Sequence, residues 1–167
     1  MDIREALRVE HSRSQTMRVV GHIGGDPARF AELVRLLLGD DRLLSQRAAW
    51  AVSYCVEHHT ELVRPYYGKF IGQLGRKDAH PAIRRNIVRL FQFVDIPSRY
   101  KAAVYDACIA LVDDPNEPVA VRAFAMTVAS NIAVGHPELI RELRLIIGKH
   151  VKDATKAFCV RARTILK

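Results

Sequence analysis

Three side chains near the middle of the chain combine residue types that bind soft metal ions. Cys55, His58 and His59 occupy positions i, i+3 and i+4, which share one face of a helix. A thiolate with two imidazoles suits zinc or copper. Three ligands within one turn are cramped, however, and the sequence indicates no fourth. A histidine near a helix C-terminus also interacts favourably with the helix dipole, so we expect neither a metal site nor a cofactor.

Acid–base chemistry has few candidates. His11 follows Glu10, and His22 lies further along the same predicted helix. A general acid or base needs a partner held within hydrogen-bond reach, and the sequence indicates none. We therefore assign no catalytic residue; a non-enzymatic protein is favoured, and an enzyme is kept as the alternative.

Aromatic and amide side chains provide a second group of candidates. Trp50 and Tyr54 are four residues apart on one helical face. We expect them to form a pair in the core; the alternative is an aromatic patch lining a groove. Asn86 and Asn131 fall in two other predicted helices, where a buried amide must be hydrogen-bonded. We expect both to tether helices to loops.

One arginine recurs along the whole chain at a nearly constant spacing. Successive members are 34, 37, 38 and 39 residues apart, and they are Arg13, Arg47, Arg84, Arg122 and Arg161. An aspartate shortly precedes four of them: Asp41, Asp78, Asp114 and Asp153. A unit of roughly 35–40 residues repeated in this way is typical of helical repeat proteins.

The apolar pattern between the turn residues has the period of a helix. It predicts nine helices, at residues 3–22, 27–38, 42–58, 60–74, 79–94, 97–112, 118–134, 137–149 and 153–166. Asp26 and Pro27 are expected to begin the second of these, as an N-cap and a first-turn proline. The glycines in 60–74 predict a helix that is bent or ends early.

These helices imply an all-α fold, with four helix pairs and a terminal helix in a single domain over residues 1–167. The repeats fall at about 3–40, 41–77, 78–113 and 114–152, followed by the terminal helix at 153–167.

Composition limits the cellular setting and the kinds of partner. The net charge is +8, and residues 141–167 alone hold eight basic and two acidic residues, a net of +6. A basic end attracts nucleic acid, acidic proteins or anionic membranes, although a solvated terminal face is the favoured interpretation. Three widely spaced cysteines indicate a reducing compartment. With no leader or membrane-spanning run, we expect a cytoplasmic protein that binds no membrane.

Several segments share a pattern of proline, then an apolar residue and arginine, then small residues. The segment from Asp78 to Arg84 is similar to that from Asp114 to Arg122, and Thr155–Ala162 and Ser45–Ala49 are weaker copies. This pattern resembles the HEAT/armadillo helical repeat family over about residues 10–166. The resemblance implies an α-α superhelix in which a ladder of ion pairs and capping hydrogen bonds joins neighbouring units. The implied ladder pairs are Asp41/Arg47, Asp78/Arg84, Asp114/Arg122 and Asp153/Arg161.

In HEAT-like repeats the second helix of each pair lines the concave surface, which implies a basic groove. The residues expected there are Arg29, Arg35, Arg64, Tyr67, Arg99, Lys101, Arg141 and Arg144. Such a stripe suits an acidic peptide or a phosphate backbone, and a solvated face is the alternative. A protein partner is favoured, and a second copy could pair through Val160, Ile165 and Leu166 of the terminal helix.

Two other functions remain as alternatives. HEAT-like DNA alkylation-repair glycosylases also use a basic concave surface, but none of their site residues can be placed on this chain. Small proteins similar to this one can carry the label adenylosuccinate lyase. The chain lacks the Ser-rich signature loop of that superfamily, so we expect no lyase activity.

Overall fold

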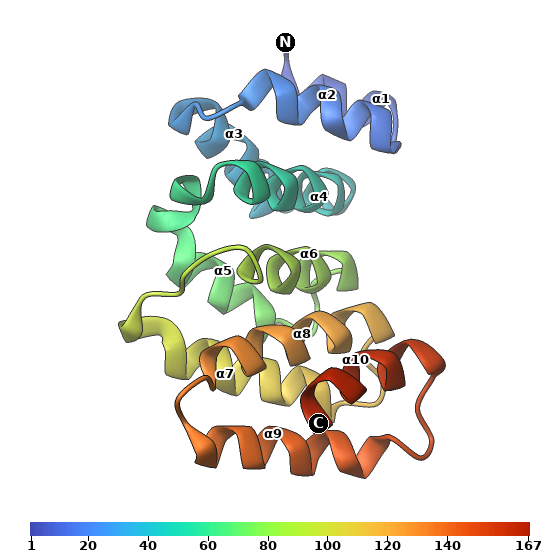
Figure 1. Ribbon diagram of the computed structural model, residues 1–167. Coiled ribbons are helices and arrows are strands. Elements are labelled where there is room, and N and C mark those ends of the chain that lie inside the picture. Colours follow the sequence, from blue (N-terminus) through green and yellow to red (C-terminus); the bar gives the residue numbers. More distant parts are fainter. The chain divides into compact units, whose positions relative to one another are not determined.

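The protein is all-helical in its computed structural model, which describes residues 1–167 (Figure 1). The chain forms ten α-helices, one 3-10 helix and no strands. The all-α fold class is confirmed, with ten helices in place of the nine expected. The chain divides into two compact units, Met1–Val94 and Asp95–Lys167. The placement of all the repeats within one domain stays a prediction.

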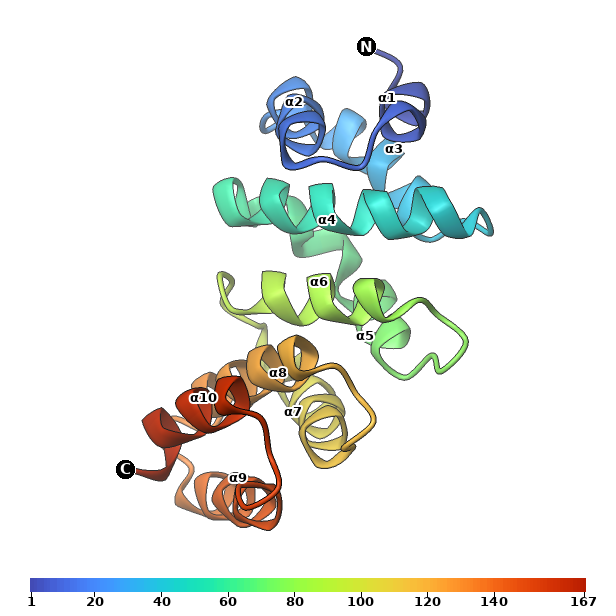
Figure 2. The ribbon, with the colours of Figure 1, turned by 90° about the vertical axis from the view of Figure 1, so that its right-hand side faces the viewer.

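The first unit is organised around one long central helix. Its elements are α1 (Ile3–Val9), α2 (Arg13–Ile23), α3 (Pro27–Leu37), α4 (Arg42–His58), η1 (Thr60–Tyr66), α5 (Tyr67–Leu74) and α6 (Pro81–Phe91). Helix α4 packs against α2, α3 and α6, and it lies beside α6 in Figures 1 and 2. Ala48, Ala49 and Ala51 are fully buried on α4, and their small side chains let the neighbouring helices approach closely.

The first predicted helix, at residues 3–22, is wrong, because the chain breaks between α1 and α2. Ser12 caps α2 by accepting a hydrogen bond from the Gln15 amide. The Gln15 side chain donates to the Ala6 carbonyl at 2.6 Å and ties α2 to α1. Serine followed three residues later by glutamine is a known signal for a helix start, so this break could have been found in the sequence.

Residues 60–74 also form two elements, the 3-10 helix η1 and the short α5. Pro65 lies inside η1, and proline has no amide hydrogen for an α-helical ladder. The expected bend is therefore present, and Pro65 explains it more directly than the glycines do.

Aspartate side chains begin two helices of the first unit. Asp26 accepts from the amides of Ala28 and Arg29, with Pro27 in the first turn as expected. Asp41 accepts from the amides of Leu43 and Leu44. These backbone hydrogen bonds favour the charged carboxylate, so the pKa of both aspartates lies below its usual value.

The second unit contains α7 (Ser98–Asp113), α8 (Val119–Ile132), α9 (Pro137–His150) and α10 (Lys156–Leu166). Helix α8 packs against the other three, and its buried face carries Val121, Ala125 and Met126. Helix α10 begins at Lys156, three residues later than expected, because Thr155 is its N-cap. None of the helices is both long enough and apolar enough to cross a membrane.

Candidate functional site

Two of the periodic arginines, Arg47 and Arg122, donate hydrogen bonds to main-chain carbonyls in the last turns of helices. Arg47 on α4 donates to the carbonyls of Leu7 and Arg8, at 2.7 and 2.9 Å. Arg122 on α8 donates through Nε and Nη2 to the Val112 carbonyl, at 3.0 and 2.8 Å. The last four carbonyls of a helix lack intrahelical partners, so these guanidinium groups satisfy the ends of α1 and α7.

Three further arginines follow the same rule. Arg84 donates to the Arg76 carbonyl at 2.7 Å, just beyond the end of α5. Arg29 donates to the carbonyl of His22 at 2.7 Å, in the last turn of α2. Arg144 donates through Nε to the carbonyl of Ile165 at 2.9 Å, in the last turn of α10. A cation at this position also interacts favourably with the negative C-terminal end of the helix dipole.

The aspartates of the expected ladder contact other groups. Asp41 caps α4 and forms an ion pair with Arg8 at 3.2 Å. Asp78 forms an ion pair with Arg76 at 2.6 Å. Asp114 accepts from the amide of Asn116 at 2.8 Å, within the α7–α8 turn. These carboxylates stabilise local turns and helix N-termini, whereas the arginines hydrogen-bond carbonyls at helix C-termini.

The last expected ladder pair, Asp153 and Arg161, lies in the terminal segment 153–167. Asp153 is exposed in the α9–α10 turn, and Arg161 is half-buried on α10. The nearby N-cap of α10 is Thr155. The pairing of Asp153 with Arg161 stays a prediction.

The residues considered for metal binding lie in different environments. Cys55 is fully buried in α4, and burial raises the pKa of its thiol to about 12. His58 is exposed, and Nδ1 of His59 lies 3.6 Å from a Glu61 carboxylate oxygen. No group of three or more His, Cys, Asp or Glu side chains is arranged to hold a metal ion.

The Trp50–Tyr54 pair lies at the edge of the first unit and not in its core. Both side chains are half-buried, with ring centroids 6.3 Å apart. Asn86 is buried as expected, but its side chain donates to the Ala82 carbonyl of its own helix at 2.8 Å. Asn131 is exposed on α8, so the expectation that it is buried is wrong.

The groove residues of the first unit have mixed surroundings. Arg29, Arg35 and Arg64 are exposed. Tyr67 is only 4% exposed, and its ring stacks on Phe91 with centroids 6.0 Å apart. The expectation that Tyr67 faces solvent is wrong, because the first residue of α5 points into the core.

The groove residues of the second unit lie on α7 and α9. The Arg99 guanidinium lies over the Tyr100 ring, 4.9 Å from its centroid, and Lys101 is half-buried. Arg141 and Arg144 are exposed one turn apart on α9. These last two line an open cavity with several apolar side chains.

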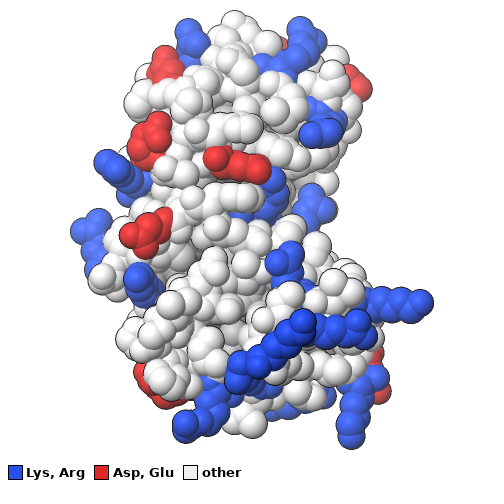
Figure 3. Space-filling view, viewed as in Figure 1, with Lys and Arg blue, Asp and Glu red and all other residues white.

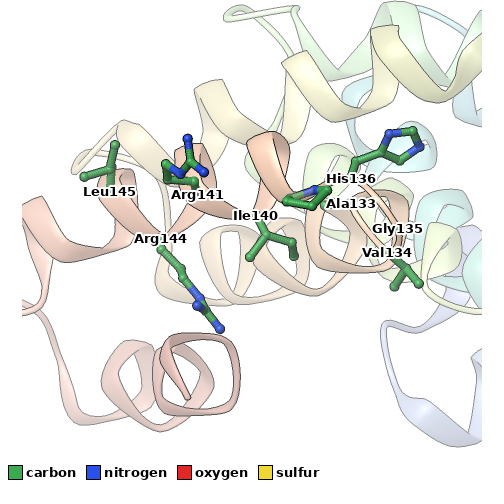
Figure 4. Close-up of a pocket in the computed structure, with 9 residues that line it drawn as sticks. Ala133, Val134, Gly135, His136, Ile140, Arg141, Arg144 and Leu145 are labelled. Atoms are coloured by element: carbon green, nitrogen blue, oxygen red, sulfur yellow. The ribbon is translucent and has the colours of Figure 1, made fainter.

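This cavity, the α8–α9 pocket, has a volume of about 590 Å³ and is lined by the end of α8, the α8–α9 turn and one face of α9. Figure 4 shows Ile140 between the turn residues and the two arginines. Val134 and Leu145 also line the pocket and are 76% and 67% exposed. Gly135 has a φ of 82°, which glycine adopts without strain, so the turn can close at this point.

The two acidic residues of α9, Glu138 and Glu142, lie close to groups other than the two arginines. The Tyr105 hydroxyl of α7 donates to the Leu139 carbonyl at 2.7 Å. Burial, followed by the nearby Glu142 carboxylate, raises the pKa of Tyr105. Glu138 lies 3.4 Å from Nδ1 of His136. Neither Glu138 nor Glu142 forms an ion pair with Arg141 or Arg144.

Basic side chains also gather elsewhere on the second unit. In Figure 3, lysine and arginine predominate where α8 and α10 lie. Val160 and Leu166 of α10 are 62% and 39% exposed, whereas Ile165 is buried inside the unit. Ile165 is thus unsuited to the terminal contact expected of it.

The comparisons with known proteins agree with the helix pairing. The family model for the HEAT repeat domain matches residues 3–167, so the chain belongs to this family. Proteins built from HEAT repeats commonly bind other proteins. Comparisons with curated proteins and with solved structures each found no match.

Proposed function

We propose that the protein is a non-enzymatic helical-repeat scaffold that binds an acidic segment of another protein. The α8–α9 pocket is its main attachment point. Arg99 and Lys101 of the second unit, with Arg35 and Arg64 of the first, supply further positive charge for the same class of partner.

The observation that supports this proposal is the combination of groups around the pocket. Ile140, Leu145 and Val134 offer apolar surface next to the guanidinium groups of Arg141 and Arg144. Such a surface suits a segment in which an apolar side chain lies close to a carboxylate. The apolar group fills the cavity and loses contact with water, and the carboxylate forms charge-assisted hydrogen bonds with arginine.

The two arginines have different freedom to bind a partner. Arg144 already donates through Nε to the Ile165 carbonyl, which fixes its side chain while its terminal nitrogens can still donate. Arg141 has no such anchor and is exposed. We therefore expect Arg144 to be the preorganised contact and Arg141 the adaptable one.

A random peptide library displayed on phage tests this proposal and does not require the partner to be identified first. The wild-type protein should enrich peptides with Asp or Glu beside Leu, Ile or Phe. Arg141→Glu should abolish that enrichment, because it places a carboxylate beside the bound one. Arg163→Glu on α10 makes the same charge change at an exposed position outside the pocket and serves as the matched control.

The result against the proposal is equally definite. Selection of peptides without acidic residues, or equal loss of binding in Arg141→Glu and Arg163→Glu, would show that the pocket does not recognise an acidic segment.

A further inference from the structure

A cluster of flat side chains covers one face of the first unit, separate from the α8–α9 pocket. Its members come from α4, from α6 and the segment just after it, and from the turn between α1 and α2. We call it the α4–α6 surface: His11, Trp50, Tyr54, Arg85, Arg89 and Phe93. His11, Arg85 and Phe93 are exposed, and the other three are half-buried. The Phe93 side chain is 40% exposed, so its ring is accessible to a partner.

These side chains form a nearly continuous row. The ring centroids of His11 and Trp50 are 5.5 Å apart, and those of Trp50 and Tyr54 are 6.3 Å apart. The Arg89 guanidinium lies 4.5 Å from the Tyr54 centroid and 5.2 Å from the Phe93 centroid. Planar groups therefore follow one another from His11, in the turn before α2, to Phe93, just beyond the end of α6.

Hydrogen bonds hold the middle of this row in place. Arg89 donates to a Glu57 carboxylate oxygen at 2.5 Å and to the Ser53 hydroxyl at 3.1 Å. The ion pair with Glu57 fixes the Arg89 guanidinium between the rings of Tyr54 and Phe93. A fixed cation between aromatic rings is a preorganised element of a binding surface.

Positive charge dominates the other end of the row. Burial, followed by the positive charges of Arg47 and Arg85, lowers the pKa of His11. Arg85 is exposed there. The exposed Arg85 therefore favours an anionic partner at this end of the row.

The planar groups narrow the class of partner further. An acidic peptide would engage the arginines, but it would match Trp50, Tyr54 and Phe93 only at positions where it carries an aromatic or apolar side chain. A single-stranded nucleic acid carries both a negative charge and a flat ring in every nucleotide. Aromatic rings bind successive bases by stacking, and arginines bind the phosphates.

We infer that the α4–α6 surface binds single-stranded nucleic acid by base stacking on Trp50 and Phe93, with Arg85 contacting the phosphate backbone. This goes beyond the proposed binding of an acidic protein segment and uses a different unit of the chain. The two proposals can fail independently.

Trp50 is the only tryptophan in the chain, so its intrinsic fluorescence reports directly on this surface. The full-length protein is titrated with an oligothymidylate of about 12 nucleotides, within the usual range for such sites. We expect saturable quenching of Trp50 that weakens as salt is raised. Polyglutamate at the same charge concentration should cause no quenching.

Two variants test the contacts one at a time. Phe93→Ala removes one stacking ring and should weaken binding between about 5-fold and 150-fold. Arg85→Gln should weaken binding and reduce the salt dependence, the slope of log affinity against log salt, by about 0.7. Arg163→Gln on α10 is the matched control and should leave both quantities unchanged. Circular dichroism confirms that each variant is folded.

Three outcomes would overturn the inference. If the oligonucleotide does not quench Trp50 fluorescence, the inference is wrong. Equal quenching by polyglutamate would assign the surface to an acidic peptide. Equal losses in Arg85→Gln and Arg163→Gln would show that binding depends only on net charge.

Discussion

Replacing Arg122 with methionine tests whether the periodic arginines stabilise the protein through helix ends. Arg122 is only 7% exposed, and two of its nitrogens donate to the Val112 carbonyl. Its guanidinium also lies 4.3 Å from the centroid of the Phe158 ring. Methionine keeps the apolar stem but leaves the carbonyl at the end of α7 without these donors.

The magnitude follows from these contacts. A hydrogen bond from a charged group contributes about 1.5–3 kcal/mol, and a partly desolvated cation–π contact adds about 0.5–2 kcal/mol. Burial of the charge opposes both, because desolvation lowers the pKa of Arg122. We expect a net loss of about 2–3 kcal/mol in the free energy of unfolding, or roughly 4–12 °C in Tm for a chain of this size.

Urea denaturation followed by far-ultraviolet circular dichroism measures this loss. Arg163→Met on the exposed face of α10 is the control and should change stability by less than about 0.5 kcal/mol. Asp114→Ala should cost less than Arg122→Met, because Asp114 contacts the α7–α8 turn. The double variant then separates the two roles.

A double-mutant cycle decides between a helix-end role and an ion-pair ladder. If Arg122 acts through the Val112 carbonyl, its coupling with Asp114 should be below about 0.5 kcal/mol. Coupling of about 2 kcal/mol, or an Arg122→Met loss no larger than that of Arg163→Met, would refute the helix-end explanation.

Three further predictions concern pH and backbone conformation. The Leu44 amide is the main cause that holds the Asp41 pKa below 3.8, so this carboxylate stabilises the fold above that pH and less as pH falls. In Asp41→Asn the new amide caps the helix as well as the carboxylate does but does not titrate. The urea midpoint of this variant should therefore vary less between about pH 5 and pH 3 than that of the wild-type protein; an unchanged pH profile would contradict this. The His11 pKa lies below 6.5 because of burial first and then Arg47 and Arg85, so Arg85→Gln should raise it in an NMR titration, and a fall would contradict the assignment. Gly135→Ala places a side chain at a φ of 82° and should cost about 1 kcal/mol in thermal unfolding, whereas no loss would show that the turn adjusts.

The sequence contained enough information for the helix periodicity. The spacing of Arg47, Arg84 and Arg122 predicted the repeat because each helix pair needs a similar group at the same place. The bounds of α4 were predicted to the residue, since Asp41 and the terminal histidines mark its ends. The break before α2 was missed although Ser12 and Gln15 signal it.

Less of the candidate site than of the fold could be predicted from the sequence. Arg141 and Arg144 were predicted as surface cations, but the cavity beside them depends on how the α8–α9 turn lies against α9. Tyr67 was assigned to the wrong face because its orientation is set by the junction of η1 and α5. Trp50 and Tyr54 were expected in the core, since helical spacing alone cannot show which face of α4 lies against α2 and α6 and which reaches solvent.

Methyl NMR of the second unit's pocket residues, in the full-length protein, tests the proposed function most directly. Addition of a selected acidic peptide should shift the methyl signals of Ile140, Leu145 and Val134 saturably, and Arg141→Glu should abolish those shifts. Saturable binding that leaves these three residues unchanged would contradict the assignment of the α8–α9 pocket as the attachment point.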